Sequence, residues 1–224
     1  MKTKPILFSA EKVQAIMNGQ KTCKRCVIKD ADKILNSPFK QRRPDIRDEH
    51  IISQLGRRPY YKGDILYVRE PIAWQSCLDC EKHDAQGRCE YEKNRRYHDE
   101  KEEHGCYMYR ASCRDNEYLS IHMPKEAARL WLRVTDVRVE RLQEITEDGA
   151  KAEGAIDNRG FIHSPENEYD HVHTARERFS EIWDSTIKKS DLDRYGWDAN
   201  PWVWLIEFER CEKPECVSDG DLGR

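Results

Sequence analysis

A cluster of cysteines between residues 75 and 118 has the residue types and spacing of a metal site. Cys77 and Cys80 form a Cys-x2-Cys pair, and Cys89 and Cys106 follow as single cysteines. Such a pair directs two thiolates at one ion, and two further ligands complete the tetrahedral coordination of zinc. The segment has few apolar residues, so a bound metal would supply folding energy that a hydrophobic core does not. We therefore predict a structural zinc held by these four cysteines.

Other arrangements of this segment stay open. Several side chains can replace the third and fourth ligands, namely His83, His98, His104 and Cys113. A loop with free thiols is the alternative to a metal site, because the second half of the motif is not a Cys-x2-Cys pair. Catalytic zinc is disfavoured, since four cysteine ligands leave no open coordination position. The earlier pair Cys23 and Cys26 is more typical of small, half-buried thiols than of a second metal site.

A second chemical group is basic and begins at Lys21, in the stretch NGQKTCKRCVIK of residues 18–29. Residues 20–62 hold twelve Lys or Arg against five acids, whereas the whole chain has a net charge of −3. Such a segment can contact phosphates, although a solvated loop has the same composition. A lysine amine can also act as a nucleophile once burial or a neighbouring cation favours its neutral form.

The hydrophobic spacing predicts which elements position Lys21. Residues 8–19 read as a helix that ends at Gly19 in the left-handed conformation, so Lys21 lies just past a helix end. A short helix from Thr146 to Gly154 has a typical N-cap and a glycine stop. The same reasoning predicts a helix over 174–187 and strands over 62–70, 130–142 and 200–210.

These elements predict a single α+β domain over residues 4–210, built on a small β-barrel with flanking helices. The apolar residues of the strand 130–142 change parity near Thr135, which implies a bend of the kind found in small barrels. Residues 30–62, rich in proline and charge, are predicted to be a long exposed loop. Residues 75–118 form the cysteine-rich insertion, and residues 211–224 are predicted to be a loose tail.

Composition limits the class of protein. The chain has 224 residues, of which 38% are hydrophobic, enough for a buried core. No apolar run approaches the ~18 residues of a membrane span. The N-terminus lacks the apolar segment of a signal peptide. We therefore expect a cytoplasmic protein with reduced thiols and no membrane partner.

Five segments of the chain resemble the ASCH-domain family: KPILFSAEKVQAIMNGQKTCKRCVIK, GDILYVREPIAW, SIHMP, RVTDVRVERLQEITEDGAKAEG and RYGWDANPWVWLIEFER. The likeness spans roughly residues 4–210 outside the variable loop and the insertion, and it is closest to ASCH proteins carried by bacteriophages and prophages. It implies a PUA-like β-barrel with flanking helices. Family members are thought to bind RNA or nucleotides, some remove the acyl group from N4-acylated cytidine, and some have been linked to RNA cleavage.

The resemblance also implies a set of catalytic residues. The family signature is Gly-x-Lys-x-x-Thr-x-Arg, and Gly19 and Lys21 match it. Lys24 and Cys26 stand at the Thr and Arg positions. In hydrolytic members the lysine, the threonine and a glutamate act together, and the resemblance places the glutamate at Glu153. The implied catalytic residues are thus Lys21, Lys24 and Glu153, with Lys24 a poor substitute for the threonine hydroxyl.

We predict a ligand cleft near Lys21 for RNA, a nucleotide or a modified nucleoside. Cations would contact phosphates, Trp74 would stack on a base, and Arg69 and Glu70 would hydrogen-bond its edge. His122 would line the cleft, although a hydrogen-bonded histidine at a strand end is equally expected. The predicted ligand-binding residues are Lys21, Thr22, Lys24, Arg25, Arg69, Glu70, Trp74 and His122.

Three further interpretations accompany this prediction. The first is an amidohydrolase in which Lys21 and Glu153 deacylate N4-acylated cytidine. The second is a phage-encoded module that binds a host protein. The third is purely structural, with Lys21 capping helix carbonyls and pairing with Glu153. The remaining tryptophans lie in strand patterns or beside them and are predicted to be core residues, namely Trp131, Trp197, Trp202 and Trp204.

Overall fold

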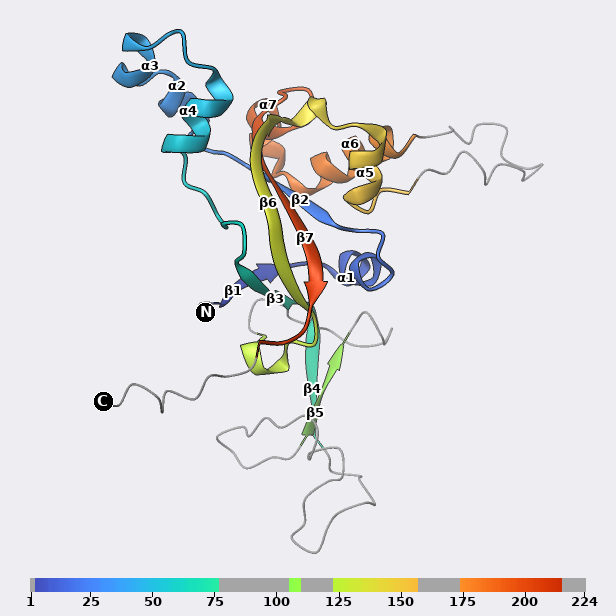
Figure 1. Ribbon diagram of the computed structural model, residues 1–224. Coiled ribbons are helices and arrows are strands. Elements are labelled where there is room, and N and C mark those ends of the chain that lie inside the picture. Colours follow the sequence, from blue (N-terminus) through green and yellow to red (C-terminus); the bar gives the residue numbers. More distant parts are fainter. Residues whose placement is uncertain (1–2, 77–104, 110–122, 157–173, 215–224) are drawn as a thin grey trace, which may run out of the picture. The chain divides into compact units, whose positions relative to one another are not determined.

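The computed structural model describes residues 3–76, 105–109, 123–156 and 174–214, with the backbone alone for 73–76 and 105–109 (Figure 1). The predicted α+β class is confirmed. The strands are β1 (Thr3–Leu7), β2 (Cys23–Val27), β3 (Ile65–Arg69), β4 (Ile72–Ser76), β5 (Gly105–Tyr109), β6 (Trp131–Arg141) and β7 (Trp202–Cys211). The helices are α1 (Ala10–Met17), α2 (Ala31–Leu35), α3 (Pro38–Arg42), α4 (Asp48–Leu55), α5 (Glu147–Ala152), α6 (Ala175–Thr186) and α7 (Leu192–Tyr195).

Five strands form a mixed sheet in the order β1-β3-β6-β7-β2. Strand β1 runs parallel to β3, whereas β3 pairs antiparallel with β6 and β2 pairs antiparallel with β7. In the last pair Cys23 lies opposite Glu207 and Arg25 lies opposite Leu205. The order leaves β1 and β2 at the two ends of the described sheet, so closure into a barrel remains a prediction.

The chain divides into two compact units. The first comprises Met1–Gln14, Ile65–Arg133 and Arg210–Arg224, and the second comprises Ala15–Asp64 and Val134–Glu209. The bounds fall within α1, β6 and β7, so these three elements contribute residues to both units.

The core of the second unit lies between β7 and the pair of helices α5 and α6 (Figure 1). Helix α6 presents Phe179 and Trp183 to this core at helical spacing, as predicted. A capping box fixes its start, where the Glu177 backbone N–H donates to the Thr174 hydroxyl and the Thr174 N–H donates to the Glu177 carboxylate. The buried cluster contains Leu142, Ile145, Ala150, Ala155, Ala175, Phe179, Trp183 and Val203.

The first unit has its own buried cluster around the Tyr67 and Trp131 rings, whose centroids are 6.0 Å apart. Trp131, Trp202 and Trp204 are buried, and Trp197 is half-buried against the core of the second unit, with its ring in edge contact with Phe179. The prediction that these tryptophans serve the core is confirmed.

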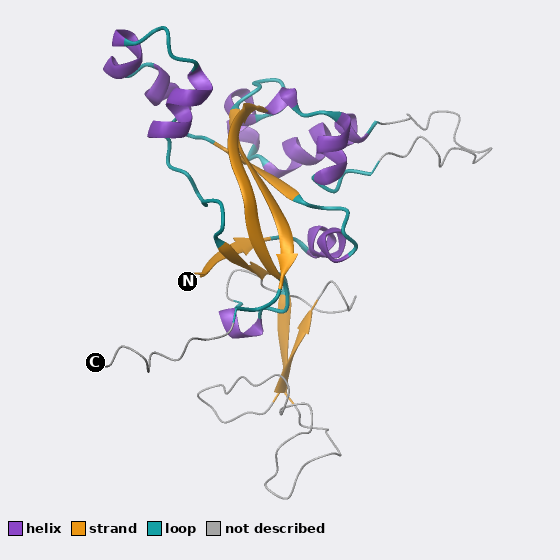
Figure 2. Cartoon of the chain, in the orientation of Figure 1, coloured by secondary structure: helices purple, strands orange, loops and turns teal. Residues whose placement is uncertain are grey.

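The prediction of a long loop over residues 30–62 is wrong, because this segment contains α2, α3 and α4 (Figure 2). Its buried side chains are those of Ala31, Ile34, Ile51 and Ile52. Pro38 does not break the structure, since it occupies the first turn of α3 behind Ser37, whose hydroxyl accepts from the Lys40 N–H. The helices are short, and a pattern of so few apolar residues gives little periodicity to detect.

Candidate functional site

Lys21 lies between the end of α1 and the start of β2, held by the backbone on both sides. Gly19 has a φ of 75°, as the predicted helix end requires. The Lys21 N–H donates to the Ala15 carbonyl at 3.1 Å, and the Thr22 N–H donates to the Ala152 carbonyl at 2.8 Å. The second bond ties this turn to the end of α5, and so brings Lys21 beside Glu153.

The Lys21 side chain is buried in an ion network, with 2% of the residue exposed. Its Nζ donates to the Glu153 Oε2 at 2.6 Å and to the Glu153 backbone carbonyl at 2.8 Å. Arg25 joins from β2, with its Nε 2.7 Å from the Glu140 Oε1 and its Nη1 3.4 Å from the Glu153 Oε1. Because buried charges are tolerated when paired and hydrogen-bonded, the network fixes all four side chains.

Helix α5 positions the glutamate of this network as the sequence predicts. The Thr146 hydroxyl accepts from the Gly149 N–H at 3.0 Å, which caps the start of the helix. Glu153 is the C-cap residue, and Gly154 ends the helix with a φ of 90°. Glu153 therefore lies at the end of a short helix whose start is fixed by the Thr146 cap and whose end is fixed by Gly154.

Gly154→Ala is expected to lower the free energy of unfolding by about 1–2 kcal/mol, the cost of placing an L side chain in the left-handed conformation. The added Cβ would lie 3.5 Å from the Ala15 Cβ and 3.6 Å from the Lys21 Cβ, which are ordinary contacts, so the cost comes from the backbone. Urea denaturation would measure the loss. Gly56→Ala is the comparison, because residue 56 has a φ of −71° that any residue can adopt. Its added Cβ would instead lie 2.5 Å from the Ile52 carbonyl oxygen, so any loss of stability there comes from a steric clash. An unchanged stability of Gly154→Ala would contradict the first of these expectations.

Lys24 and Arg25 lie on opposite faces of β2. Successive strand residues point to opposite faces, so Cys23 and Arg25 share one face of β2 while Lys24 and Cys26 share the other. Lys24, at the family Thr position, is thus directed away from the face on which Arg25 meets Glu153. The described network contains Arg25, and a catalytic role for Lys24 remains a prediction drawn from the resemblance.

A cavity of about 270 Å³ opens beside this network, and we call it the Arg25 cavity. Arg25 links the two, because its side chain lines the cavity and also reaches Glu153. Lys21 and Glu153 belong to the network behind the lining. The lining residues are Thr22, Cys23, Arg25, Thr135, Arg138, Glu140, Glu144, Thr146, Gly149, Ala152, Leu205, Glu207 and Phe208.

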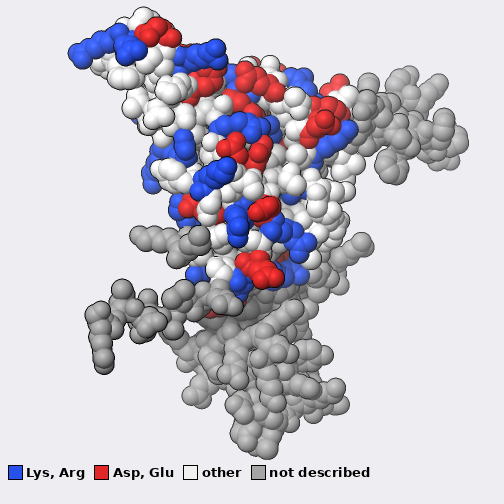
Figure 3. Space-filling view, in the orientation of Figure 1, with Lys and Arg blue, Asp and Glu red and all other residues white. Residues whose placement is uncertain are grey.

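The lining of the Arg25 cavity carries both signs of charge, with the guanidinium groups of Arg25 and Arg138 and the carboxylates of Glu140, Glu144 and Glu207. The Arg138 Nη1 is 2.7 Å from the Glu207 Oε1. On the face shown in Figure 3, Lys and Arg side chains are likewise interspersed with Asp and Glu. The cavity thus offers fixed hydrogen-bond donors and acceptors without a strong excess of positive charge.

Cys23 lines the Arg25 cavity, and its thiol has low reactivity. Burial, reinforced by the nearby Glu153 carboxylate and opposed by Lys21 and Arg25, raises the pKa of Cys23 from 9.0 to about 12. The thiolate is the reactive form of cysteine, so Cys23 has little nucleophilic character near neutral pH. The half-buried thiols of Cys26 and Cys211, like that of Cys23, are not in disulfides.

The raised pKa of Cys23 predicts a loss of stability in alkali. Between pH 9 and 12 the unfolded thiol is ionised while the folded thiol keeps its proton, so the unfolded state binds fewer protons and stability falls as pH rises. The expected contribution is about 1.4 kcal/mol between pH 8 and pH 10. Urea denaturation of wild type and Cys23→Ala at both pH values, under reducing conditions, measures it. If the free energy of unfolding changed equally with pH in the two proteins, the raised pKa of Cys23 would be contradicted.

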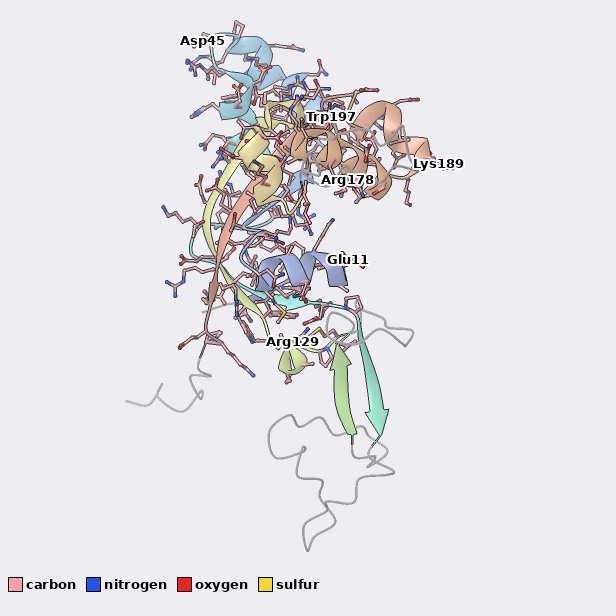
Figure 4. All side chains as sticks on the ribbon, turned by 90° about the vertical axis from the view of Figure 1, so that its right-hand side faces the viewer. Glu11, Asp45, Arg129, Arg178, Lys189 and Trp197 are labelled. Carbon is pink, nitrogen blue, oxygen red and sulfur yellow. The ribbon has the colours of Figure 1, made fainter. Side chains whose placement is uncertain are left out.

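The other predicted ligand residues lie in the first unit or outside the described side chains. Glu70 is fully buried, and its two carboxylate oxygens accept from the Arg129 Nε and Nη2, each at 2.8 Å (Arg129 is labelled in Figure 4). The Arg69 guanidinium lies 5.6 Å from the centre of the Tyr67 ring. The Trp74 side chain and His122 lie outside the description. Glu70 is therefore already engaged by Arg129, and a ligand role for these four residues remains a prediction.

The predicted metal ligands fall mostly outside the described residues, which include none of Cys77, Cys80 and Cys89. Among the described residues no group of three potential ligands is found. The backbone of β5 nevertheless pairs Cys106 with Gln75 of β4, two positions before Cys77 in the sequence. The metal site itself remains a prediction.

Sequence reasoning missed several polar residues that line the Arg25 cavity, namely Arg138, Glu140, Glu144, Thr146 and Glu207. Glu140 and Arg138 alternate with apolar residues along β6, but the pairing of Glu140 with Arg25, and the place of Arg138 in the same cavity lining, depend on the strand order β6-β7-β2. That order joins strands far apart in the sequence, and the local pattern does not encode it. Thr146 could have been identified from its predicted N-cap role, because an N-cap residue holds its hydroxyl at the start of a helix.

None of the described helices is both long enough and apolar enough to cross a membrane. Comparison of the chain with models of protein families, with curated proteins and with solved structures gives no match.

Proposed function

We propose that the chain is an ASCH-type protein with a PUA-like fold that binds a nucleoside, or a nucleoside within a nucleotide or RNA, in the Arg25 cavity. The observation that carries the proposal is the position of Arg25, which lines a cavity of about 270 Å³ while Glu140 and Glu153 hold its guanidinium group. A fixed donor in a small polar cavity can orient a flat heterocycle by its carbonyl oxygen.

The charges of the cavity favour the nucleoside part of such a ligand over its phosphate. The carboxylates of Glu140, Glu144 and Glu207 can accept from amino or hydroxyl groups, but they repel an anion. Arg25 and Arg138 can donate to ring or acyl oxygens. A neutral nucleoside with both donors and acceptors matches this lining.

The 2.6 Å contact between the Lys21 Nζ and the Glu153 Oε2 supports a second candidate, the hydrolysis of N4-acylated cytidine. A carboxylate at this distance can take the proton that the amine must lose to become a nucleophile, and can return it to the leaving amine. Attack of the amine on the acyl carbonyl would form an acyl-lysine amide as the bond to the cytosine N4 breaks and cytidine leaves, and water would then hydrolyse that amide to give the free acid and the free amine. Lys21 is buried, so this mechanism requires the acyl group to reach the network past Arg25.

Calorimetric titration with cytidine and N4-acetylcytidine tests the binding proposal. Arg25→Gln and Arg138→Gln are expected to weaken binding by at least about tenfold, since each removes a charged donor from the lining. Arg138 has 49% of its side chain exposed, so its variant should fold even if the buried Arg25 does not tolerate substitution. Arg178→Gln is the matched control, because Arg178 is an exposed guanidinium on α6 (labelled in Figure 4) that pairs with Glu181. Equal affinity in all four proteins would refute the proposal.

Incubation with N4-acetylcytidine, followed by chromatography of released cytidine, tests the hydrolytic candidate. Release that disappears in Lys21→Met, while that variant still binds cytidine, would support a catalytic amine. Binding without release by the wild type would leave the cavity as a binding site and exclude the amidohydrolase.

We also propose that Cys77, Cys80, Cys89 and Cys106 hold a structural zinc. The support is the β4–β5 ladder, which pairs the Cys106 backbone with Gln75 near Cys77. Zinc would order this segment by joining its two ends. Elemental analysis of protein purified without added metal is expected to give about one zinc per chain, falling in Cys77→Ser but not in Cys211→Ser. A content below about 0.2 per chain would exclude the site, because structural zinc binds tightly.

A further inference from the structure

Gly149 has no side chain at a point where two hydrogen-bonding groups of the Arg25 cavity come together. A Cβ at residue 149 would lie 3.2 Å from the Thr146 Oγ1, 3.3 Å from the Ile145 Cγ1 and 3.4 Å from the Arg25 Nη2. Gly149, Thr146 and Arg25 all line the cavity. The two polar atoms therefore flank a space at the cavity wall that any larger residue at position 149 would fill.

The backbone does not require a glycine at this position. Gly149 lies inside α5, and positive φ values are found at Gly19, Gly63 and Gly154 but not here, so an L residue can adopt its conformation. Glycine is also the poorest helix former after proline, so alanine would favour α5 itself. The missing side chain therefore weakens the helix locally while it leaves room beside Arg25 and Thr146.

Arg25 keeps one of its donor groups uncommitted. Its Nε donates to Glu140 at 2.7 Å, and its Nη1 lies 3.4 Å from the Glu153 Oε1 and 3.8 Å from the Cys23 Sγ. Its Nη2 makes no hydrogen bond within the described part of the chain. Because Glu140 holds the guanidinium group and the centre of the Phe179 ring lies 5.9 Å from its Cζ, the Nη2 group is fixed in place before a ligand arrives.

The second donor is the hydroxyl of Thr146. Its Oγ1 accepts from the Gly149 N–H at 3.0 Å, which occupies one lone pair and leaves the O–H proton for another partner. Thr146 is exposed and lines the cavity, so this proton can be donated to a bound molecule. A ligand oxygen in the space beside Gly149 can thus accept from both a hydroxyl and a guanidinium group.

We propose that Gly149 determines the specificity of the Arg25 cavity by leaving a subsite for one uncharged carbonyl oxygen, which accepts from the Arg25 Nη2 and the Thr146 hydroxyl. The proposal rests on the function proposed above and names the part of the ligand that this subsite takes, an acyl oxygen carried on the exocyclic amine of the base. The same guanidinium group reaches Glu153 through Nη1, so the subsite lies next to the Lys21–Glu153 pair. An uncharged oxygen is favoured because the carboxylates of the same lining repel an anion.

Calorimetric titration of the wild type and Gly149→Ala with N4-acetylcytidine and with cytidine tests the proposal. The wild type is expected to bind N4-acetylcytidine at least about tenfold more tightly than cytidine, because the acyl oxygen gains a hydrogen bond to a charged donor. In Gly149→Ala the methyl group fills the subsite, so this preference is expected to disappear, while the affinity for cytidine changes by less than about threefold. A Gly149→Ala protein that keeps the wild-type preference would overturn the proposal.

Two substitutions of Thr146 test the same subsite without changing Gly149. Serine and aspartate can both cap α5, but only serine keeps a hydroxyl proton to donate. Thr146→Ser is therefore expected to keep the preference for N4-acetylcytidine, and Thr146→Asp is expected to lose it. Equal preferences in these two variants would contradict the role of the hydroxyl and overturn the proposal.

The matched control is Lys151→Ala, which places alanine at an exposed position of the same helix that does not line the cavity. It is expected to bind both nucleosides as the wild type does, and an equal loss there would show that any change in α5 disturbs the cavity, which would overturn the subsite. Equal binding of the two nucleosides by the wild type would overturn the subsite alone. Binding of neither would refute the function proposed for the Arg25 cavity and the subsite with it.

Discussion

Glu153→Leu is expected to lower the free energy of unfolding by about 3–5 kcal/mol, because it leaves buried cations without the carboxylate that compensates them. Lys21 would lose a partner 2.6 Å away, and Arg25 one at 3.4 Å. Lys21 would keep the backbone carbonyl of residue 153, at 2.8 Å, which offsets only part of the loss. Urea denaturation at neutral pH measures the change.

The double variant Lys21→Met/Glu153→Leu separates the cost of an unpaired charge from that of lost packing. It is expected to be more stable than Glu153→Leu, since it removes the buried ammonium together with its partner. Lys21→Met alone should cost less than Glu153→Leu, because Glu153 keeps the Arg25 guanidinium. Equal losses in all three variants would contradict this account of the network.

Trp183→Ala is expected to cost about 3–5 kcal/mol, the range for removing a large aromatic side chain from a core. Trp183 packs 6.0 Å from the Phe179 ring, and its Nε1 donates to the Tyr195 carbonyl at 2.8 Å. The same cluster contains Ala150 of α5, so the loss also loosens the helix that ends at Glu153. Thermal unfolding measures the first effect, and cytidine binding measures the second.

Phe39→Ala is the control for this prediction, since Phe39 is 49% exposed. It is expected to change stability by less than about 0.5 kcal/mol. Trp183→Phe should keep most of the packing but lose the hydrogen bond to Tyr195, so its free energy of unfolding should lie between those of Trp183→Ala and Phe39→Ala. A Trp183→Ala protein as stable as the control would mean that α5 and α6 do not share one core.

The elements around the site are predicted well from sequence because their signals are local. Thr146 and Gly154 mark the two ends of α5, and Gly19 marks the end of α1, each through a backbone requirement that few residue types meet. The apolar spacing of α6 predicts Phe179 and Trp183 as core residues, and the structure buries both.

The membership of the site could not be predicted in the same way, because it depends on register. A shift of one residue in the register of β2 would place Lys24, instead of Arg25, on the face that meets Glu153. The strand order that places Glu140 within 2.7 Å of Arg25 depends on pairing between distant segments. The helices of residues 30–62 were missed for another reason, since α2 and α4 bury only two side chains each and α3 buries none.

The contact between Lys21 and Glu153 joins residues 132 positions apart, and β2 pairs with β7, the last of the described strands. During synthesis, Lys21 and Arg25 are therefore made long before Glu140 and Glu153. Lys21 can pair with its carboxylate only after residue 153 has left the ribosome. The edge on which β2 pairs stays open until β7 has been synthesised. Loop closure over such distances is slow, so we expect the Arg25 cavity to be among the last features to form, and premature termination before β7 to yield a product without it.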